Sequence, residues 1–296
     1  MTEVSSLPVR AVDIGGTKIA LATVEGTSVS DRHQFATPRT GRGLDLVASI
    51  ADALRRMPGD GPVAVATTGM VDEGRLTALN PTTLPIENGF PLVETLAEAI
   101  GTVPLLLNDA QAAAWGEYRY GAGRGCANFT FMTVSTGIGA GIVVNGQLLV
   151  GRRGLAGHLG HVVADPNGPH CGCGRRGCLE TMASGTALAR LGSDALGKPM
   201  GAPELFAIAA GGNENAKTVI RTAARRVASS LGDLSAVCDV ERVALGGGVG
   251  LAPGFLELVL EAVNDLPPTF QREVVRAEAG PDAGLIGVAA LAVTSI

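Results

Sequence analysis

The chain has 296 residues, of which 46% are hydrophobic, 17% are charged and 42 are glycine, so it can bury a large core in two domains or in one large α/β unit. Its net charge of −5 and isoelectric point near 5.4 argue against a nucleic-acid-binding surface, and Arg175-Arg176 is too small a basic patch to change that. The first residues do not resemble a secretion signal, and no apolar stretch is long enough to span a bilayer, so we expect no membrane partner and a cytoplasmic protein.

The first half of the chain alternates strand and helix patterns. Residues 9–14 (VRAVDI) form a β-branched run that ends at glycines and resumes as IALATV, which predicts a hairpin. Residues 44–57 carry apolar side chains at helical spacing and stop before Pro58-Gly59. The elements expected after the hairpin are a strand at 28–36, a helix at 44–57, a strand at 63–69, a helix at 91–100, a strand at 103–108 and a helix that begins at Asp109.

The same pattern restarts at residue 129, where strand, glycine turn and strand lead to an Asn-Gly turn and a third strand. The second half therefore resembles a diverged copy of the first. Further elements are expected as helices at 180–191, 203–211 and 215–237, a buried strand at 240–248, a helix from Pro253 and a closing helix near 283–294. We expect an N-terminal α/β domain of residues 1–115, on which the closing helix 283–296 packs back, and a larger domain of residues 116–282 with a cysteine-rich loop at residues 157–180.

One glycine-bracketed stretch carries four side chains that bind soft metals. They are His161, Cys171, Cys173 and Cys178. Their spacing favours a closed, four-coordinate zinc site with no position left for a substrate, and hence a structural role. A disulfide or a set of free thiols is the alternative, which a reducing compartment disfavours. Cys126 and Cys238 are isolated, and we expect each to be a buried small hydrophobe.

Three glycine clusters lie at the ends of predicted strands. The first, at 13–18 (DIGGTK), and the second, at 135–141 (STGIGAG), could each close backbone N–H groups on a phosphate, although a plain hairpin turn is the alternative. The third, at 246–250 (GGGVG), follows a buried strand and precedes a helix, where a nucleotide could lie on exposed backbone. Together the three clusters favour a nucleotide site.

Asn108-Asp109 ends an apolar strand and begins a helix. Asp109 suits a helix N-cap, and a carboxylate at the carboxyl end of a strand also suits a general base, so both interpretations stay open. Asn80 and Glu180 are polar residues in apolar or glycine-rich surroundings, where a turn or helix-start role is the alternative to substrate binding.

In their order along the chain, the motifs DIGGTK, NDAQAAAW, STGIGAG, GHLGH and CGCGRRGCLE resemble those of the ROK family of sugar kinases and repressors, across essentially the whole sequence. Among the members of this family, the chain is most similar to the bacterial N-acetylmannosamine kinases. The resemblance implies the actin-like, ribonuclease-H-like fold of two α/β domains, with ATP in the cleft between them, and a homodimer.

The resemblance also implies roles for individual residues. The implied ATP-binding residues are Asp13, Gly15, Gly16, Thr17, Lys18, Thr136, Gly137, Gly246, Gly247, Gly248 and Val249. The implied sugar-binding residues are Asn80, Asn108, Asp109, His158, His161 and Glu180. Asp109 is the implied catalytic base, and the four residues of the cysteine-rich loop are the implied zinc ligands.

One position departs from the common family pattern. His158 stands where most sugar kinases of the family have a glutamate. This difference favours an N-acylated hexosamine over glucose as the substrate. Alternatively, His158 could support the residues that contact the sugar without contacting the sugar itself. The expected activity is ATP- and Mg²⁺-dependent phosphorylation of the 6-hydroxyl of N-acetylmannosamine, a step in sialic acid breakdown. A glucokinase or another hexose kinase is the alternative. A repressor is disfavoured because only about ten residues precede the first predicted strand, and intact Asp13 and Asp109 disfavour a silent sugar sensor.

Overall fold

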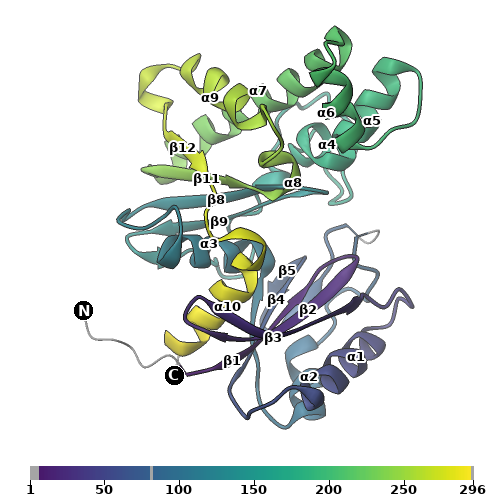
Figure 1. Cartoon of the computed structure of the whole chain (residues 1–296), viewed down its shortest axis with the longest axis vertical. Helices are drawn as coiled ribbons and strands as arrows, with labels where there is room; N and C mark the ends of the chain where they lie inside the picture. Colours follow the sequence, from purple (N-terminus) through teal and green to yellow (C-terminus); the bar gives the residue numbers. More distant parts are fainter. Residues whose placement is uncertain (1–6, 81–82, 295–296) are drawn as a thin grey trace. The chain divides into compact units, whose positions relative to one another are not determined.

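The structure is a computed structural model that describes residues 7–80 and 83–294. The chain divides into two compact units, each with its own sheet (Figure 1). Unit 1 consists of Met1–Gly121, Leu148–Ala156 and Ala279–Ile296. Unit 2 consists of Ala122–Gln147 and Gly157–Glu278.

This division departs from the boundary that we expected after residue 115. α3 (Asp109–Tyr120) is one continuous helix that stays with unit 1 to its end, so the chain leaves the unit only after Gly121. Leu148–Ala156 also returns to unit 1 from the second half of the sequence, which we did not predict.

Unit 1 is built on a mixed sheet with the strand order β3-β2-β1-β4-β7. Its strands are β1 (Val9–Ile14), β2 (Lys18–Glu25), β3 (Ser28–Ala36), β4 (Val63–Thr67) and β7 (Leu105–Asn108). The first three strands pair antiparallel, as the hairpin pattern predicted, whereas β1, β4 and β7 run parallel. Because parallel strands end at the same edge, Ile14, Thr67 and Asn108 lie side by side there.

Helices cover both faces of this sheet (Figure 1). α1 (Gly43–Arg56) and α2 (Leu92–Ile100) pack on the face where the central strands present branched side chains such as Val12 and Val65. α3 and α10 (Ala283–Thr294) pack on the face that presents alanines such as Ala11 and Ala64. Because side chains alternate between the two faces of a strand, one face of the sheet carries bulky branched side chains and the other carries small alanines and is flat.

The flat face lets α3 and α10 approach closely. A Cβ atom on Gly116 would lie 2.6 Å from the carbonyl oxygen of Ala283, and one on Gly287 would lie 1.7 Å from that of Ala112. Only glycine fits at these two positions. α10 is apolar on all sides and largely buried, as a helix packed inside a domain should be.

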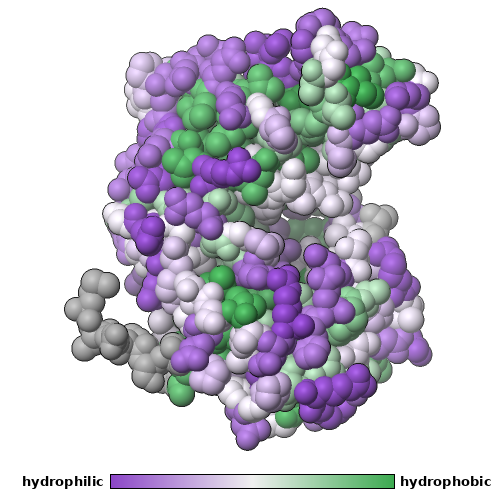
Figure 2. Space-filling model, in the orientation of Figure 1, coloured by the Kyte–Doolittle hydropathy of each residue, from purple (hydrophilic) through white to green (hydrophobic). Residues whose placement is uncertain are grey.

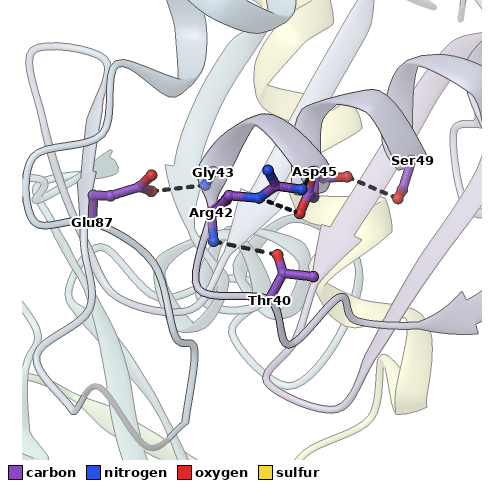
Figure 3. Close-up of polar contacts among 6 residues, drawn as sticks. All are labelled: Thr40, Arg42, Gly43, Asp45, Ser49 and Glu87. Carbon is purple, nitrogen blue, oxygen red and sulfur yellow. Dashed lines mark hydrogen bonds and ion pairs between the residues drawn. The ribbon is translucent and has the colours of Figure 1, made fainter.

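The start of α1 is fastened by side chains around it (Figure 3). The helix has no side-chain cap of its own, but the Glu87 carboxylate accepts a hydrogen bond from the Gly43 N–H at 2.7 Å. Arg42 pairs with Asp45 in the first turn at 2.8 Å. Negative charge here also suits the helix dipole. Hydrophilic residues dominate the visible outer face of α1 and α2, as amphipathic helices require (Figure 2).

Unit 2 repeats the architecture of the first sheet with the order β10-β9-β8-β11-β12. Its strands are β8 (Phe129–Val134), β9 (Ile138–Val144), β10 (Gln147–Leu148), β11 (Arg242–Gly246) and β12 (Glu273–Arg276). β8 and β9 pair antiparallel, while β8, β11 and β12 run parallel, as do their counterparts in unit 1. The internal repeat predicted from the sequence is therefore present in the fold.

The helices of unit 2 follow the predicted order with one correction. They are α4 (Glu180–Ala183), α5 (Gly185–Leu196), α6 (Ala202–Ala210), α7 (Glu214–Cys238), α8 (Gly247–Gly250) and α9 (Phe255–Asn264). The single helix predicted at 180–191 is wrong, because Ser184 adopts an extended conformation and its side chain caps α5 through the Ala187 N–H at 3.1 Å.

Three short strands were not predicted. β5 (Met70–Asp72) and β6 (Arg75–Thr77) form a small hairpin after β4, and β12 completes the second sheet. None of the helices within residues 7–80 and 83–294 has both the length and the apolar character that a membrane span requires.

Candidate active site

Asn108 and Asp109 lie at the carboxyl edge of the unit 1 sheet, where β7 passes into α3. Asn108, not Asp109, is the N-cap, because its Oδ1 accepts hydrogen bonds from the N–H groups of Ala110 at 3.0 Å and Gln111 at 3.2 Å. Its Nδ2 donates to the Gly69 carbonyl at 3.0 Å. The cap role considered for Asp109 therefore belongs to its neighbour.

Asp13 occupies the same edge near the end of β1. Burial, and then the negative charge of Asp109, raise the pKa of Asp13 from 3.8 to about 7, against the opposing charge of Lys18. Asp282, which pairs with Arg32 at 2.6 Å, also raises this pKa. The two predicted acidic residues are thus brought into mutual electrostatic reach, and the arrangement favours an added cation.

The DIGGTK motif forms the turn between β1 and β2, so the hairpin interpretation is correct in structural terms. A Cβ atom on Gly16 would lie 2.6 Å from the Thr83 carbonyl oxygen, which requires glycine there. Thr37 Oγ1 donates to the Gly15 carbonyl at 2.7 Å and steadies the turn. Thr17 and Lys18 are exposed at its end, where both can still donate to an anion.

The second turn, between β8 and β9, is coupled to Glu180 within unit 2. Glu180 Oε2 accepts a hydrogen bond from the Ile138 N–H at 3.0 Å, and a Cβ atom on Gly137 would lie 2.5 Å from the same oxygen. Burial raises the pKa of Glu180, while this N–H and the charge of His158 act in the opposite direction. Thr186 Oγ1 donates to the Thr136 carbonyl at 2.9 Å and holds the turn from the other side.

The third glycine cluster joins β11 to α8. Gly247 has a φ of +85°, and a Cβ atom on it would lie 2.4 Å from the Val134 carbonyl oxygen. Gly246 is similarly closed by the ring of Phe131, at 2.6 Å, whereas a Cβ on Gly248 would meet nothing within 4 Å. Val249 is buried in the core, so only the backbone of this segment can face a ligand.

The cysteine-rich loop gathers all four predicted metal ligands. The ligand atoms of His161, Cys171, Cys173 and Cys178 lie within 4.8 Å of one another. Cys171 Sγ is 3.6 Å from His161 Nδ1, and Cys173 Sγ is 3.6 Å from Cys178 Sγ. A tetrahedral zinc ion with Zn–S bonds of about 2.3 Å and Zn–N bonds of about 2.0–2.1 Å has ligand separations of about 3.5–3.8 Å. The donor set and its spacing therefore fit zinc.

The loop is also connected to the neighbouring site residues. His158 precedes the short 3-10 helix Leu159–His161 and His161 ends it, and the two rings stack with centroids 6.3 Å apart. Glu180 follows Cys178 by two residues and begins α4. Burial raises the pKa of the Cys171 thiol to about 12, so a bound cation must displace its proton. Of the isolated cysteines, Cys126 is buried, as expected, but Cys238 is only half-buried.

Asn80 sits in a turn, where its carbonyl oxygen accepts a hydrogen bond from the Thr83 N–H at 3.0 Å. That agrees with the turn interpretation, and its proposed contact with a sugar stays a prediction. The sequence reasoning missed Gln111, which is 1% exposed and binds the backbone of Leu148–Ala156. The available signal was one amide side chain in an alanine-rich helix start, DAQAAAW.

Comparisons with known proteins extend this description. The sequence model of the ROK family matches residues 9–295. The N-acetylmannosamine kinase of Yersinia pestis (strain Pestoides F) is 46% identical over 291 residues, which cover 97% of this chain and 98% of that protein.

Two solved structures resemble the whole chain. The ROK hexokinase from Thermus thermophilus matches with a TM-score of 0.85 and 36% identity, covering 98% of this chain and 100% of that one. A ROK family glucokinase from Streptomyces griseus, solved in complex with glucose and AMPPNP, matches with a TM-score of 0.82 and 31% identity, covering 96% and 99%.

Proposed function

This chain belongs to the ROK family, and we propose that it transfers the γ-phosphoryl group of ATP to the 6-hydroxyl of N-acetylmannosamine, as a step in sialic acid breakdown. The observation that carries the proposal is the 46% identity to an N-acetylmannosamine kinase over 97% of this chain. Its two units, which repeat one strand order, have the actin-like ATPase fold that the resemblance implied. The protein is accordingly a sugar kinase.

Asp109 is the proposed general base. It would accept the proton of the sugar hydroxyl as the hydroxyl oxygen attacks the γ-phosphorus, a step that depends on positioning and electrostatics. Two features of the site support this role. Asn108 already caps α3, and Asp109 lies at the sheet edge within the electrostatic reach of Asp13.

The glycine turns are the proposed nucleotide-binding elements. The turn at 15–18 would offer its backbone, Thr17 and Lys18 to phosphate, and the turns at 136–137 and 246–249 would offer backbone groups. Mg²⁺ fits beside Asp13, because a divalent cation offsets the like charge that raises the pKa of this carboxyl. When bound, the ion would supply charge neutralisation on the phosphates.

Zinc has a structural role in this proposal. Four protein ligands complete a tetrahedron, so no coordination position remains for substrate or water. The ion would hold His161 in place beside His158, and Cys178 two residues before Glu180. We propose that His158 and Glu180 then bind sugar hydroxyl or acyl groups, with Asn80 and Asn108 as further sugar contacts.

A hexose kinase of broader or different specificity is the second candidate. The observation that favours it is the 36% identity to a ROK hexokinase and the 31% identity to a ROK glucokinase, each over nearly the whole chain. The N-acetylmannosamine kinase shares more residues with this chain, which is why we place it first. A homodimer and a cytoplasmic location remain part of the proposal on the strength of the resemblance alone.

The reaction is tested by incubating the purified protein with ATP, Mg²⁺ and N-acetylmannosamine. Release of ADP should depend on the sugar, and phosphorus NMR of the product should show a phosphate coupled to the two protons on carbon 6. A phosphate on carbon 1, or ADP release that does not depend on sugar, would contradict the proposal.

A further inference from the structure

Two buried side-chain amides lie three residues apart at the start of α3. Asn108 is 6% exposed and Gln111 is 1% exposed, and residues at this spacing share one face of a helix. Asp109 lies between them in sequence, and successive helical residues point about 100° apart, so it does not share their direction. The first turn of α3 therefore carries the proposed base between two amides that point elsewhere.

Both amides bind the backbone of other segments of unit 1. Asn108 Nδ2 donates to the Gly69 carbonyl at 3.0 Å, immediately before β5. Gln111 Nε2 donates to the Ala156 carbonyl at 2.8 Å and lies 3.4 Å from the Gly154 carbonyl. The amides thus fasten two loops to the helix that carries Asp109.

The second of these loops, residues 151–156, contains no helix or strand of its own. Gly154 packs against β5, where a Cβ atom on it would lie 2.0 Å from the Val71 carbonyl oxygen. Arg153 pairs with Asp72 at 3.0 Å, but the Arg153 side chain is 71% exposed, and such ion pairs contribute little. Gln111 therefore supplies a buried polar anchor for this loop. Directly after it, the chain continues through Gly157 to His158.

We propose that Gln111 is a positioning residue that fastens the 151–156 loop to the first turn of α3, the turn that carries Asp109, and so shapes the sugar-binding side of the site. It acts through backbone carbonyls and touches no reacting atom. The inference rests on the proposed function, because the ligand that the loop would surround is the acceptor sugar. Loss of Gln111 should therefore weaken sugar binding much more than ATP binding.

The side-chain chemistry suggests two informative substitutions. Gln111→Met keeps a similar length but has no donor, so the two carbonyls lose their partner. Gln111→Glu keeps the shape and places carboxylate oxygens against two carbonyl oxygens. A matched control is Gln34→Met, because Gln34 is exposed on β3.

We expect Gln111→Met to raise the KM for N-acetylmannosamine by about tenfold, which corresponds to about 1.4 kcal/mol. The KM for ATP and kcat should change by less than about threefold, since a loop displacement that weakens ground-state binding leaves the base in place. Gln111→Glu should raise the KM for the sugar further, again with little change in the KM for ATP or in kcat. Gln34→Met should match wild type.

A second measurement does not depend on activity. Arg152 and Arg153 are exposed trypsin sites within the loop. Limited tryptic digestion without ligands, read by intact mass, should cleave Gln111→Met there several-fold faster than wild type, while cleavage elsewhere stays the same. Loop opening lowers local stability and not the stability of the whole molecule.

The outcomes separate this inference from the proposed function. Unchanged cleavage at Arg152 and Arg153 together with an unchanged sugar KM would overturn the role of Gln111. A fall in kcat and a rise in both KM values by similar factors, with faster cleavage throughout the chain, would show general destabilisation. That result would also overturn the role of Gln111. If wild-type protein does not phosphorylate N-acetylmannosamine, the proposed function fails, and the role in loop anchoring is decided by digestion alone.

Discussion

Neighbouring residues at the start of α3 divide two tasks. Asn108 caps the first helical N–H groups, whereas Asp109, whose Oδ1 also accepts from the Ala110 N–H at 2.8 Å, is the proposed base. Asn and Asp are about equally good caps, so replacing Asp109 by Asn should leave the start of the helix intact. The structure therefore permits a clean test of the base.

Asp109→Asn should keep the fold and lose most turnover, because an amide cannot accept the hydroxyl proton. General-base contributions are typically about 10²–10⁴-fold, so kcat should fall within that range. Thermal unfolding should change little, since Asn108 still caps the helix. Asp60→Asn, on an exposed loop, is the control. Turnover within about threefold of wild type would exclude Asp109 as the base.

The ionised carboxylate of Asp13 destabilises the folded, ligand-free protein, and the size of this effect depends on pH. Its pKa in the folded protein is raised from 3.8 to about 7, mainly by burial and then by Asp109. Between these values the folded state binds more protons than the unfolded state, so the stability of the protein without ligands falls as pH rises from about 4 to about 7. A bound cation or nucleotide complex would relieve this cost.

Asp13→Asn should therefore stabilise the ligand-free protein at pH 8 more than at pH 5, because the amide never ionises. One pKa unit equals about 1.4 kcal/mol, so the gain at pH 8 is at most on the order of 4 kcal/mol, and less where water reaches the carboxyl. Urea unfolding at both pH values measures it. Parallel pH profiles for wild type and the variant would contradict the pKa shift.

At the residue scale, the spacing of glycine, cysteine and histidine in the sequence predicted turns and a cluster of metal-binding side chains. It identified both hairpin turns and the four side chains that the structure gathers into one cluster suited to a metal ion, because these motifs are local. We considered the cap role for Asp109, although Asn108 holds it, and we missed Gln111, because the partners of the Gln111 amide come from residues 154–156. Contacts so distant in sequence leave no periodic trace.

Among the elements, the cysteine-rich loop depends most on something other than packing. It has no regular structure beyond the 3-10 helix Leu159–His161, and it is rich in glycine. Gly177, with a φ of +65°, packs its Cα so close to Asp165 that a Cβ would lie 1.5 Å from the Asp165 carbonyl oxygen. Metal binding is the natural source of order for such a loop, since its free energy becomes folding free energy.

Removing one of the four proposed zinc ligands should therefore disorder the neighbouring residues that we propose bind the sugar. Metal analysis of wild type should give about one Zn²⁺ per chain. Cys173→Ser should lose this ion and raise the sugar KM by at least about tenfold, the usual scale for disturbing a metal site, with a smaller effect on the KM for ATP. Cys238→Ser, outside the cluster, is the control. Fully active wild-type protein without zinc would refute the structural role.

Periodicity predicted most elements well, including the closing helix, which the structure places at Ala283–Thr294. The failures have local causes. The predicted helix at 180–191 breaks because Ser184 turns its side chain to cap α5, and the strands β5, β6 and β12 are too short for alternation to stand out. The length of α3 shifted the boundary of unit 1 beyond residue 115.

At the scale of the whole molecule, the two units have sheets of corresponding strand order, and each sheet has a glycine turn between its first two strands. Unit 1 adds the acidic pair Asp13 and Asp109, whereas unit 2 adds the cysteine-rich loop with His158 and Glu180. The repeat was visible in the sequence, but the return of Leu148–Ala156 to unit 1 was not, because it depends on buried tertiary contacts.

The preference for N-acetylmannosamine as the acceptor sugar is tested most directly by comparing kcat/KM across several acceptors. ADP release should be measured with N-acetylmannosamine, N-acetylglucosamine, mannose, glucose and fructose in one zinc-replete preparation. N-acetylmannosamine should have the highest kcat/KM, at least about tenfold above that of glucose, because discrimination is a difference in transition-state binding. A higher kcat/KM for glucose than for N-acetylmannosamine would contradict it and support a glucokinase.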